Sequence, residues 1–238
     1  MLTFNCCLLR NDGMGGGNSV TKNLMFNWVR ETSDHGNFNS WDRLPFITDA
    51  AGKKGTDVLV TNMTNNFVIS NYASTWPLDH DDGSCYYHDT KNYLVWAGAK
   101  NFLGQAKISA ENIYVNVESN GFNVCAVDDS HWATDKASGK PINADKFENN
   151  TCITASGDLY QFSTCDPEDI PGTTDLSGGN TIMSSAPAAA VGFKCGSENL
   201  TLQEFQKQGY EQGSTLQKMP TPAEIAEMGR KLLGIGDH

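Results

Sequence analysis

Residues 91–98 read KNYLVWAG. A similar order of residue types occurs in KNLMFNW (22–28), NNFVISN (65–71) and ENIYVNVES (111–119). In each stretch an asparagine precedes three or four residues of the types that favour β-strands. Fainter copies follow in NNTCITAS (149–156) and GNTIMSS (179–185). A short strand and a turn residue that recur at intervals of about 20 residues or more are typical of a solenoid.

The asparagines at positions 23, 66, 92 and 112 are separated by 43, 26 and 20 residues. Asparagine suits the bend between two strands because its side chain bonds nearby backbone and because it tolerates left-handed backbone angles. Coils stacked on one another would align these side chains into a polar ladder. A β-sandwich with irregular loops is the alternative, but it does not need a repeated asparagine register. We therefore expect an all-β fold, a solenoid.

The last forty residues have a different pattern. Thr201 and Glu204 form a capping box ahead of a short helix that Gly209 ends, and Thr221, Pro222 and Glu224 start a second helix. The second helix has one apolar face, made by Ile225, Met228, Leu232 and Leu233. We expect residues 1–199 to form the solenoid and residues 200–238 a helical cap of the same domain, covering its open end.

Composition excludes two classes of protein. The chain has 238 residues, a formal net charge of −11 and no Lys/Arg block, so it lacks the basic surface of a nucleic-acid-binding protein. Its apolar runs are far shorter than the roughly 20 residues that a membrane-spanning helix needs. With 23 glycines it fits a fold of many short strands and turns, and we expect a monomer.

Seven cysteines and three glycosylation sequons, at Asn62, Asn149 and Asn199, together predict an oxidising, extracellular setting. The odd number leaves at least one cysteine without a partner in the chain, and the pairing stays open. The first residues, MLTFNCCLLR, lack the layout of a signal peptide and read like the middle of a folded unit. We expect an N-terminally truncated fragment.

The asparagine repeats, together with RETSDHGNFNSWDR (30–43), DHDDGSCYYHDTKNYLVWAGAKN (79–101) and LTLQEFQKQGYEQGS (200–214), resemble the right-handed parallel β-helix proteins of the pectate-lyase-like superfamily. The resemblance implies that this all-β solenoid is a right-handed parallel β-helix. Within the superfamily, the chain looks like a branch near glycoside-hydrolase-like secreted proteins. The resemblance implies the fold more specifically than the reaction, because this fold carries lyases, hydrolases, esterases, epimerases and binding modules.

The first candidate segment is DHGNFNSWDR, residues 34–43. Histidine can pass a proton near neutral pH, and an indole ring stacks on sugar faces whose hydroxyls bond to carboxylates, amides and guanidinium groups. The candidates are Asp34, His35, Asn39, Trp41, Asp42 and Arg43. The structural alternative is a long loop held by an Arg–Asp pair and asparagine turns.

The second candidate segment is LDHDDGSCYYHD, residues 78–89. Crowded carboxyls can raise the pKa of one of them, which provides a protonated acid beside an ionised base or nucleophile, as glycosidases require. Asp81 and Asp82 face opposite sides if the segment is extended, so one of the two would face a given cleft. His80 and His88 are further candidates. The alternatives are an acidic turn or a calcium loop, although EF-hand spacing is missing.

Lys100 and Asn101, one coil further on, complete the candidate residues. We expect a secreted glycoside hydrolase that uses Asp81 or Asp82 with a second acid such as Asp42, while His35 and Arg43 position the polysaccharide. The first alternative is a polysaccharide lyase, with His35 or Lys100 as the base and Arg43 on the uronate. The second is a non-catalytic glycan-binding solenoid. We expect no cofactor, and a structural or substrate-bridging Ca²⁺ stays open.

Overall fold

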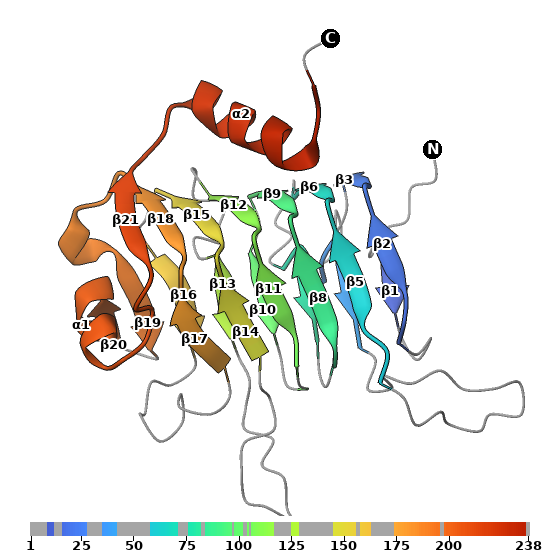
Figure 1. Cartoon of the computed structure of the whole chain (residues 1–238), viewed down its shortest axis with the longest axis horizontal. Helices are drawn as coiled ribbons and strands as arrows, with labels where there is room; N and C mark the ends of the chain where they lie inside the picture. Colours follow the sequence, from blue (N-terminus) through green and yellow to red (C-terminus); the bar gives the residue numbers. More distant parts are fainter. Residues whose placement is uncertain are drawn as a thin grey trace, which may run out of the picture.

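The computed structural model describes residues 9–11, 16–27, 35–41, 58–70, 76–81, 84–96, 98–101, 104, 106–116, 125–128, 145–155, 158–162, 174–195 and 198–236. Three β-sheets account for most of them (Figure 1). Sheet A holds β1 (Leu9–Asn11), β4 (Phe38–Ser40), β7 (Leu78–His80), β10 (Ala99–Asn101), β13 (Ala126–Asp128), β16 (Asp158–Phe162), β19 (Gly192–Cys195) and β20 (Glu198–Thr201).

Sheets B and C complete each coil. Sheet B holds β2 (Ser19–Thr21), β5 (Thr61–Thr64), β8 (Tyr87–Thr90), β11 (Ile108–Ala110), β14 (Asp145–Glu148) and β17 (Thr174–Gly178). Sheet C holds β3 (Leu24–Phe26), β6 (Phe67–Ile69), β9 (Tyr93–Val95), β12 (Ile113–Asn116), β15 (Thr151–Thr154), β18 (Thr181–Ser184) and β21 (Thr215–Lys218). A short 3-10 helix, Ala188–Ala190, precedes β19.

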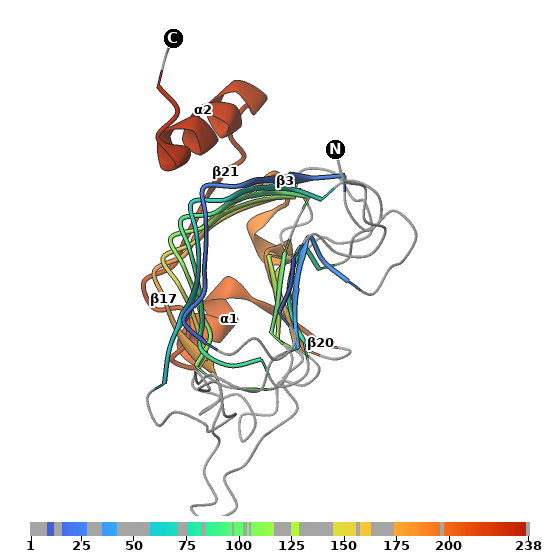
Figure 2. The same cartoon turned by 90° about the vertical axis from the view of Figure 1, so that its right-hand side faces the viewer.

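The chain visits sheets A, B and C in turn, and each strand pairs with its counterpart one coil away. All of these pairs are parallel, and the one antiparallel pair in the described residues joins β19 to β20. Viewed along the stack, the coils superimpose around a common interior (Figure 2). The prediction of a parallel β-helix is confirmed.

The asparagine ladder is present at the turn between sheets B and C. The backbone N–H and Nδ2 of Asn66 both donate to Oδ1 of Asn92, at 2.9 and 3.0 Å. Asn92 does the same to Asn112, at 2.9 and 3.0 Å. The ladder runs through Asn23, Asn66, Asn92, Asn112, Asn150 and Asn180. A second Nδ2 bond reaches a backbone carbonyl of sheet B, as from Asn112 to Asp89, at 2.8 Å.

The left-handed residue of this turn is the one before the ladder asparagine. Positive φ angles occur at Lys22, Asn65, Lys91, Glu111, Asn149 and Gly179. The sequence-based expectation that the ladder asparagines themselves supply the left-handed conformation is therefore wrong. Their role is to satisfy buried hydrogen-bonding groups, since the five from Asn66 onward are almost fully buried.

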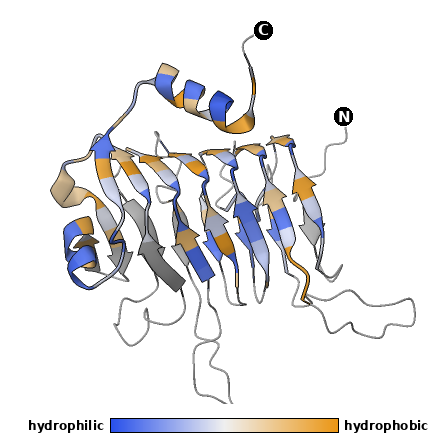
Figure 3. Ribbon diagram, viewed as in Figure 1, coloured by the Kyte–Doolittle hydropathy of each residue, from blue (hydrophilic) through white to orange (hydrophobic). Residues whose placement is uncertain are grey.

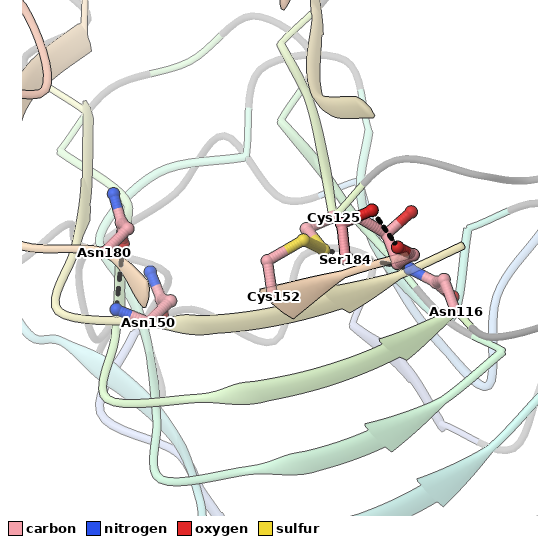
Figure 4. Close-up of a disulfide and its surroundings, with 7 residues drawn as sticks. Asn116, Cys125, Asn150, Cys152, Asn180 and Ser184 are labelled. Atoms are coloured by element: carbon pink, nitrogen blue, oxygen red, sulfur yellow. Dashed lines mark hydrogen bonds between the residues drawn. A yellow bond between two sulfur atoms is a disulfide. The ribbon is translucent and has the colours of Figure 1, made fainter. Parts of the chain in front are cut away.

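Apolar side chains fill the interior of the coils. Met25, Val68, Leu94, Tyr114, Cys152 and Ile182 lie in one inward row of sheet C. Cys152 forms a buried disulfide with Cys125 across the interior, a short way from the ladder pair Asn150–Asn180 (Figure 4). The three sequon asparagines, Asn62, Asn149 and Asn199, are all exposed.

Both predicted capping boxes are confirmed, at α1 (Leu202–Lys207) and α2 (Pro222–Leu233). α1 closes the C-terminal end of the stack, where Phe205 stacks on Phe193 with ring centroids 4.0 Å apart. α2 lies elsewhere than expected, along the outer face of sheet C and not over the open end (Figures 1 and 2). The reason is that this outer face is apolar and its residues pack against the predicted apolar face of α2; Figure 3 shows that both sheet C and α2 contain many hydrophobic residues.

The ladder yields a first prediction. Asn112→Leu removes two Nδ2 donations and leaves the buried N–H and Nδ2 of Asn92 without their acceptor. We expect a loss of about 3 kcal/mol in the free energy of unfolding, measured by urea denaturation. Asn23→Leu, at the exposed end of the ladder, is the matched control and should cost no more than about 1 kcal/mol. Equal losses would contradict a stabilising role for the buried ladder.

The packing of α2 yields a second prediction. A Cβ at Gly229 would lie 2.6 Å from Cζ of Tyr93, whose hydroxyl donates to the carbonyl of Ile225 at 3.1 Å. Gly229→Ala should therefore lift α2 from sheet C and accelerate hydrogen exchange in residues 222–233, with little change in the strands. Gly236→Ala, where nothing lies within 4 Å of the added Cβ, is the control. Unchanged exchange in the first variant would refute the close contact.

Candidate functional site

Three neighbouring strands of sheet A bring candidate residues together. Asn39 of β4, Asp79 of β7 and Lys100 of β10 are register partners in the parallel ladder. The residues before them, Phe38, Leu78 and Ala99, belong to the interior core. Because side chains alternate along a strand, the first three lie in one row on the outer face of sheet A.

Asp81 is the residue after β7, and its side chain also reaches Lys100. We call these four residues (Asn39, Asp79, Asp81 and Lys100) the Lys100 cluster. The ammonium nitrogen of Lys100 lies 3.1 Å from Oδ1 of Asp79 and 3.0 Å from Oδ1 of Asp81. Nδ2 of Asn39 donates to the other oxygen of Asp79 at 2.8 Å. One cation is thus shared by two carboxyl groups.

The two carboxyl groups have different surroundings. The side chain of Asp79 has no exposed surface, whereas that of Asp81 is 33% exposed. Burial raises the pKa of Asp79, and the charge of Lys100 opposes this only in part. Burial alone would lower the pKa of Lys100, but the two carboxylates outweigh it and raise that pKa. Burial therefore makes Asp79 take up a proton more readily than an ordinary aspartic acid does, although it lies beside Lys100.

Two tryptophans adjoin the cluster. Trp41 directly follows β4, whose last residue Ser40 pairs with His80, and it is 46% exposed. The ammonium of Lys100 lies 5.8 Å from the ring centroid of Trp76, within the range of a cation–π interaction. Trp41 and Asp81, each the residue after a strand of sheet A, both have exposed surface.

Three predicted site residues lie away from this face. His80 and Asn101 are register partners on the opposite, interior side of sheet A, and both are buried. His88 is on sheet B, where burial lowers its pKa. His35 precedes β4 and is partly buried. The predictions for Asp34, Asp42, Arg43 and Asp82 lie outside the described residues.

His80 instead takes part in a buried interior network. Its Nδ1 lies 2.8 Å from Oγ of Ser40, and its Nε2 lies 2.7 Å from Oδ2 of Asp89. All three residues are almost fully buried, so a substrate does not reach this Ser–His–Asp arrangement. The hydroxyl of Ser84 lies 2.9 Å from that of Ser40 and donates to the carbonyl of Asp81 at 2.7 Å. The network joins sheets A and B and holds the backbone under the Lys100 cluster.

A second buried pair lies further along the interior. The ammonium of Lys107 lies 2.9 Å from Oδ2 of Asp145, and both side chains are buried. The backbone N–H of Lys107 donates to the other oxygen of Asp145 at 2.8 Å. This pair links consecutive coils through their interior and has no exposed surface for a ligand.

Asp79 is the site residue that the sequence reasoning missed. The signal was available, because the alternation that separates Asp81 from Asp82 also places Asp79 on the same side as Asp81. The buried partners Ser40 and Asp89 were missed for another reason: the stacking of coils brings Ser40, 40 positions away, to His80, and the bend from sheet A to sheet B brings Asp89.

The site analysis yields a third prediction. Lys100→Met removes the cation that limits the pKa of Asp79, so this pKa rises further above its unfolded value of about 3.9. Between those two values the folded protein keeps a proton that the unfolded chain releases, and stability falls as pH rises. We expect the variant to lose about 3 kcal/mol at pH 7 and much less at pH 4 in urea unfolding.

The control for this prediction is the double variant Asp79→Asn, Lys100→Met, which has no carboxyl group at the buried position 79. The double variant should recover most of the stability at pH 7. A loss that is equal at both pH values would show that Lys100 acts through the packing of its aliphatic stem and not through its charge.

Comparison with known proteins does not identify the chain: no family model, no curated protein and no solved structure matches it. Within the described residues, no three His, Cys, Asp or Glu side chains gather in a way that could hold a metal ion. No helix of the described chain is long and apolar enough to cross a membrane. The Cys125–Cys152 disulfide hints at an oxidising, extracellular environment.

Proposed function

We propose that the outer face of sheet A binds a glycan and that Asp79 and Asp81 hydrolyse a glycosidic bond there. The observation that carries this proposal is the sharing of Lys100 by two carboxyl groups in unequal surroundings. The exposed carboxylate keeps the ion pair with Lys100, and the buried one holds its proton. A protonated acid next to an ionised carboxylate is the pair that glycoside hydrolysis needs.

The spacing of the pair favours a retaining reaction. Oδ1 of Asp79 and Oδ1 of Asp81 lie 3.1 and 3.0 Å from one nitrogen, so they are no more than about 6 Å apart. Retaining glycosidases have carboxyl separations of about 5–5.5 Å, and inverting ones about 6.5–9.5 Å. Asp81 would attack the anomeric carbon while Asp79 gives its proton to the departing oxygen. Water would then cleave the ester and return a proton to Asp79.

The charge of the cluster favours a neutral glycan. Lys100 is matched by Asp81, so no positive charge is left for a uronate carboxylate. The raised pKa of Lys100 keeps it protonated, which makes it a poor base for β-elimination. These features support a hydrolase over the polysaccharide lyase expected as the first alternative.

The burial of Asp79 favours a second candidate, a glycan-binding solenoid without activity. A catalytic acid must touch the glycosidic oxygen, and Asp79 has no exposed surface here. In a binding module, Asp79 would only orient Lys100, while Asp81 and Trp41 would contact the sugar. The experiment below separates these two functions.

The setting we propose is extracellular. The disulfide and the exposure of all three sequon asparagines support it. The parallel β-helix with an asparagine ladder also supports a relationship to the pectate-lyase-like superfamily, which we keep as a proposal.

Our fourth prediction is tested by incubating the protein with neutral and acidic polysaccharides and following reducing ends and unsaturated-uronate absorbance together. We expect reducing ends on a neutral polysaccharide without new absorbance. Asp81→Asn and Asp79→Asn should each lower the rate at least about a hundredfold. Glu111→Gln, which changes an exposed carboxylate paired with Lys91, is the matched control and should keep full activity.

The outcomes separate the three functions. New absorbance would establish a lyase and reject hydrolysis. No product from any substrate, together with glycan binding that Asp79→Asn retains and Trp41→Ala loses, would establish the binding solenoid. Activity that survives both aspartate substitutions would place the chemistry elsewhere.

A further inference from the structure

A cavity of about 420 Å³ separates the first half of α2 from the outer face of sheet C. Its floor is formed by the sheet, where Val95 and Val115 are register partners on neighbouring strands. One wall is α2 with its connection to β21 (Figure 1), and the other is formed by Ala155 and Ser185, which directly follow β15 and β18. Sites for one small molecule usually have volumes of about 300–1,000 Å³.

The cavity exists because α2 touches sheet C at one point and has a short side chain next to it. A Cβ at Gly229 would lie 2.6 Å from Cζ of Tyr93, so the helix meets the sheet there. The hydroxyl of Tyr93 donates to the carbonyl of Ile225 at 3.1 Å, which fixes the position of the preceding turn. Ala226 lies three residues before Gly229 on the same side of the helix, and its methyl group is too short to fill the space. Packed elements therefore form the cavity in advance of any ligand.

The lining of the cavity is apolar. Among the described residues that line it, none has a charged side chain, and two have a hydroxyl group, Tyr93 and Ser185. Burial raises the pKa of the Tyr93 phenol, which keeps it neutral. The Tyr93 hydroxyl is bonded to α2, whereas the exposed Ser185 hydroxyl forms no hydrogen bond with any residue that the structure describes. The cavity thus offers apolar contact and one hydrogen-bonding group.

We propose that this cavity binds one small uncharged molecule that has an apolar body and a single hydroxyl group. The body packs between Val95 and Val115 of the sheet and Ala226 of the helix, and the hydroxyl forms a hydrogen bond with Ser185. The site belongs to sheet C and α2, whereas the Lys100 cluster belongs to sheet A. The binding is therefore independent of the proposed hydrolysis.

The lining disfavours other occupants. A charged ligand would lose its hydration without meeting an opposite charge. Lys218 and Glu224 directly precede lining residues, but they are not part of the lining themselves, and their charges interact with each other. A peptide segment would bring several backbone groups that need hydrogen bonds, and Ser185 can satisfy only one or two of them. A small alcohol has both the size and the polarity that the cavity requires.

The test uses the unmodified full chain and N-phenyl-1-naphthylamine, an uncharged probe whose fluorescence rises in apolar surroundings. We expect saturable binding of one probe molecule per chain. The probe is then displaced with 1-octanol, octanoate or octylammonium, which share one apolar body and differ in charge. We expect 1-octanol to displace it at a concentration at least about tenfold lower than either ion does.

Substitutions locate the binding. Ala226→Leu fills the cavity and should weaken the probe affinity at least about tenfold. Ala223→Leu makes the same change at an exposed position of α2 outside the lining, and this control should change the affinity less than about twofold. Hydrogen exchange in residues 222–233 shows whether α2 keeps its place. Ser185→Ala preserves the shape of the cavity and should weaken 1-octanol binding roughly two- to tenfold, which decides the matter if Ala226→Leu displaces the helix.

Four results would overturn the proposal. A lack of saturable binding by the unmodified protein would leave the cavity as a gap in packing. Equal probe affinities of the two leucine variants, with α2 in place in both, would put the probe elsewhere on the protein. Tighter binding of octanoate or octylammonium would contradict an uncharged ligand. Unchanged 1-octanol affinity in Ser185→Ala would contradict the hydrogen bond to that hydroxyl.

Discussion

The hydrogen bonds of the asparagine ladder are the constraint on which the rest of the structure depends. A solenoid coil must turn between sheets B and C within two residues, and the turn leaves buried backbone groups that water does not reach. From Asn66 onward, a ladder asparagine satisfies its neighbour's N–H and a carbonyl of sheet B at once, as Asn112 does. Coils can stack in this way only with their asparagines in line, so the ladder sets the register of all three sheets.

This register assembles the Lys100 cluster on another side of the solenoid. The B–C turn is the same length in every coil, whereas the spacing between ladder asparagines varies from 20 to 43 residues. The variable connections are those that lead into and out of sheet A. The outer face of sheet A therefore brings side chains that are far apart in sequence, such as Asn39 and Lys100, into one row. The connections next to this face can vary in length.

The two carboxyl groups of the Lys100 cluster differ in how far they are buried. One partly exposed and one buried carboxyl group share Lys100, and burial raises the pKa of the buried one, Asp79. On the inner side of the same strands, Ser40, His80 and Asp89 form a chain of hydrogen bonds that fixes the backbone beneath the cluster. The outer face of β7 thus carries the Lys100 cluster, and its inner face carries the hydrogen bonds that support the backbone.

Local patterns in the sequence were enough to predict the parallel β-helix, the asparagine ladder and both capping boxes, because each depends on residues within one turn or on a repeat. The same alternation rule could have found Asp79, which lies two residues from Asp81. The position of α2 could not be predicted, since it depends on the outer face of sheet C being apolar along its whole length. The shared cation and the buried His80 network were decided by tertiary structure alone, because they join residues that are 9 to 40 positions apart in the sequence and meet only when the coils form and stack.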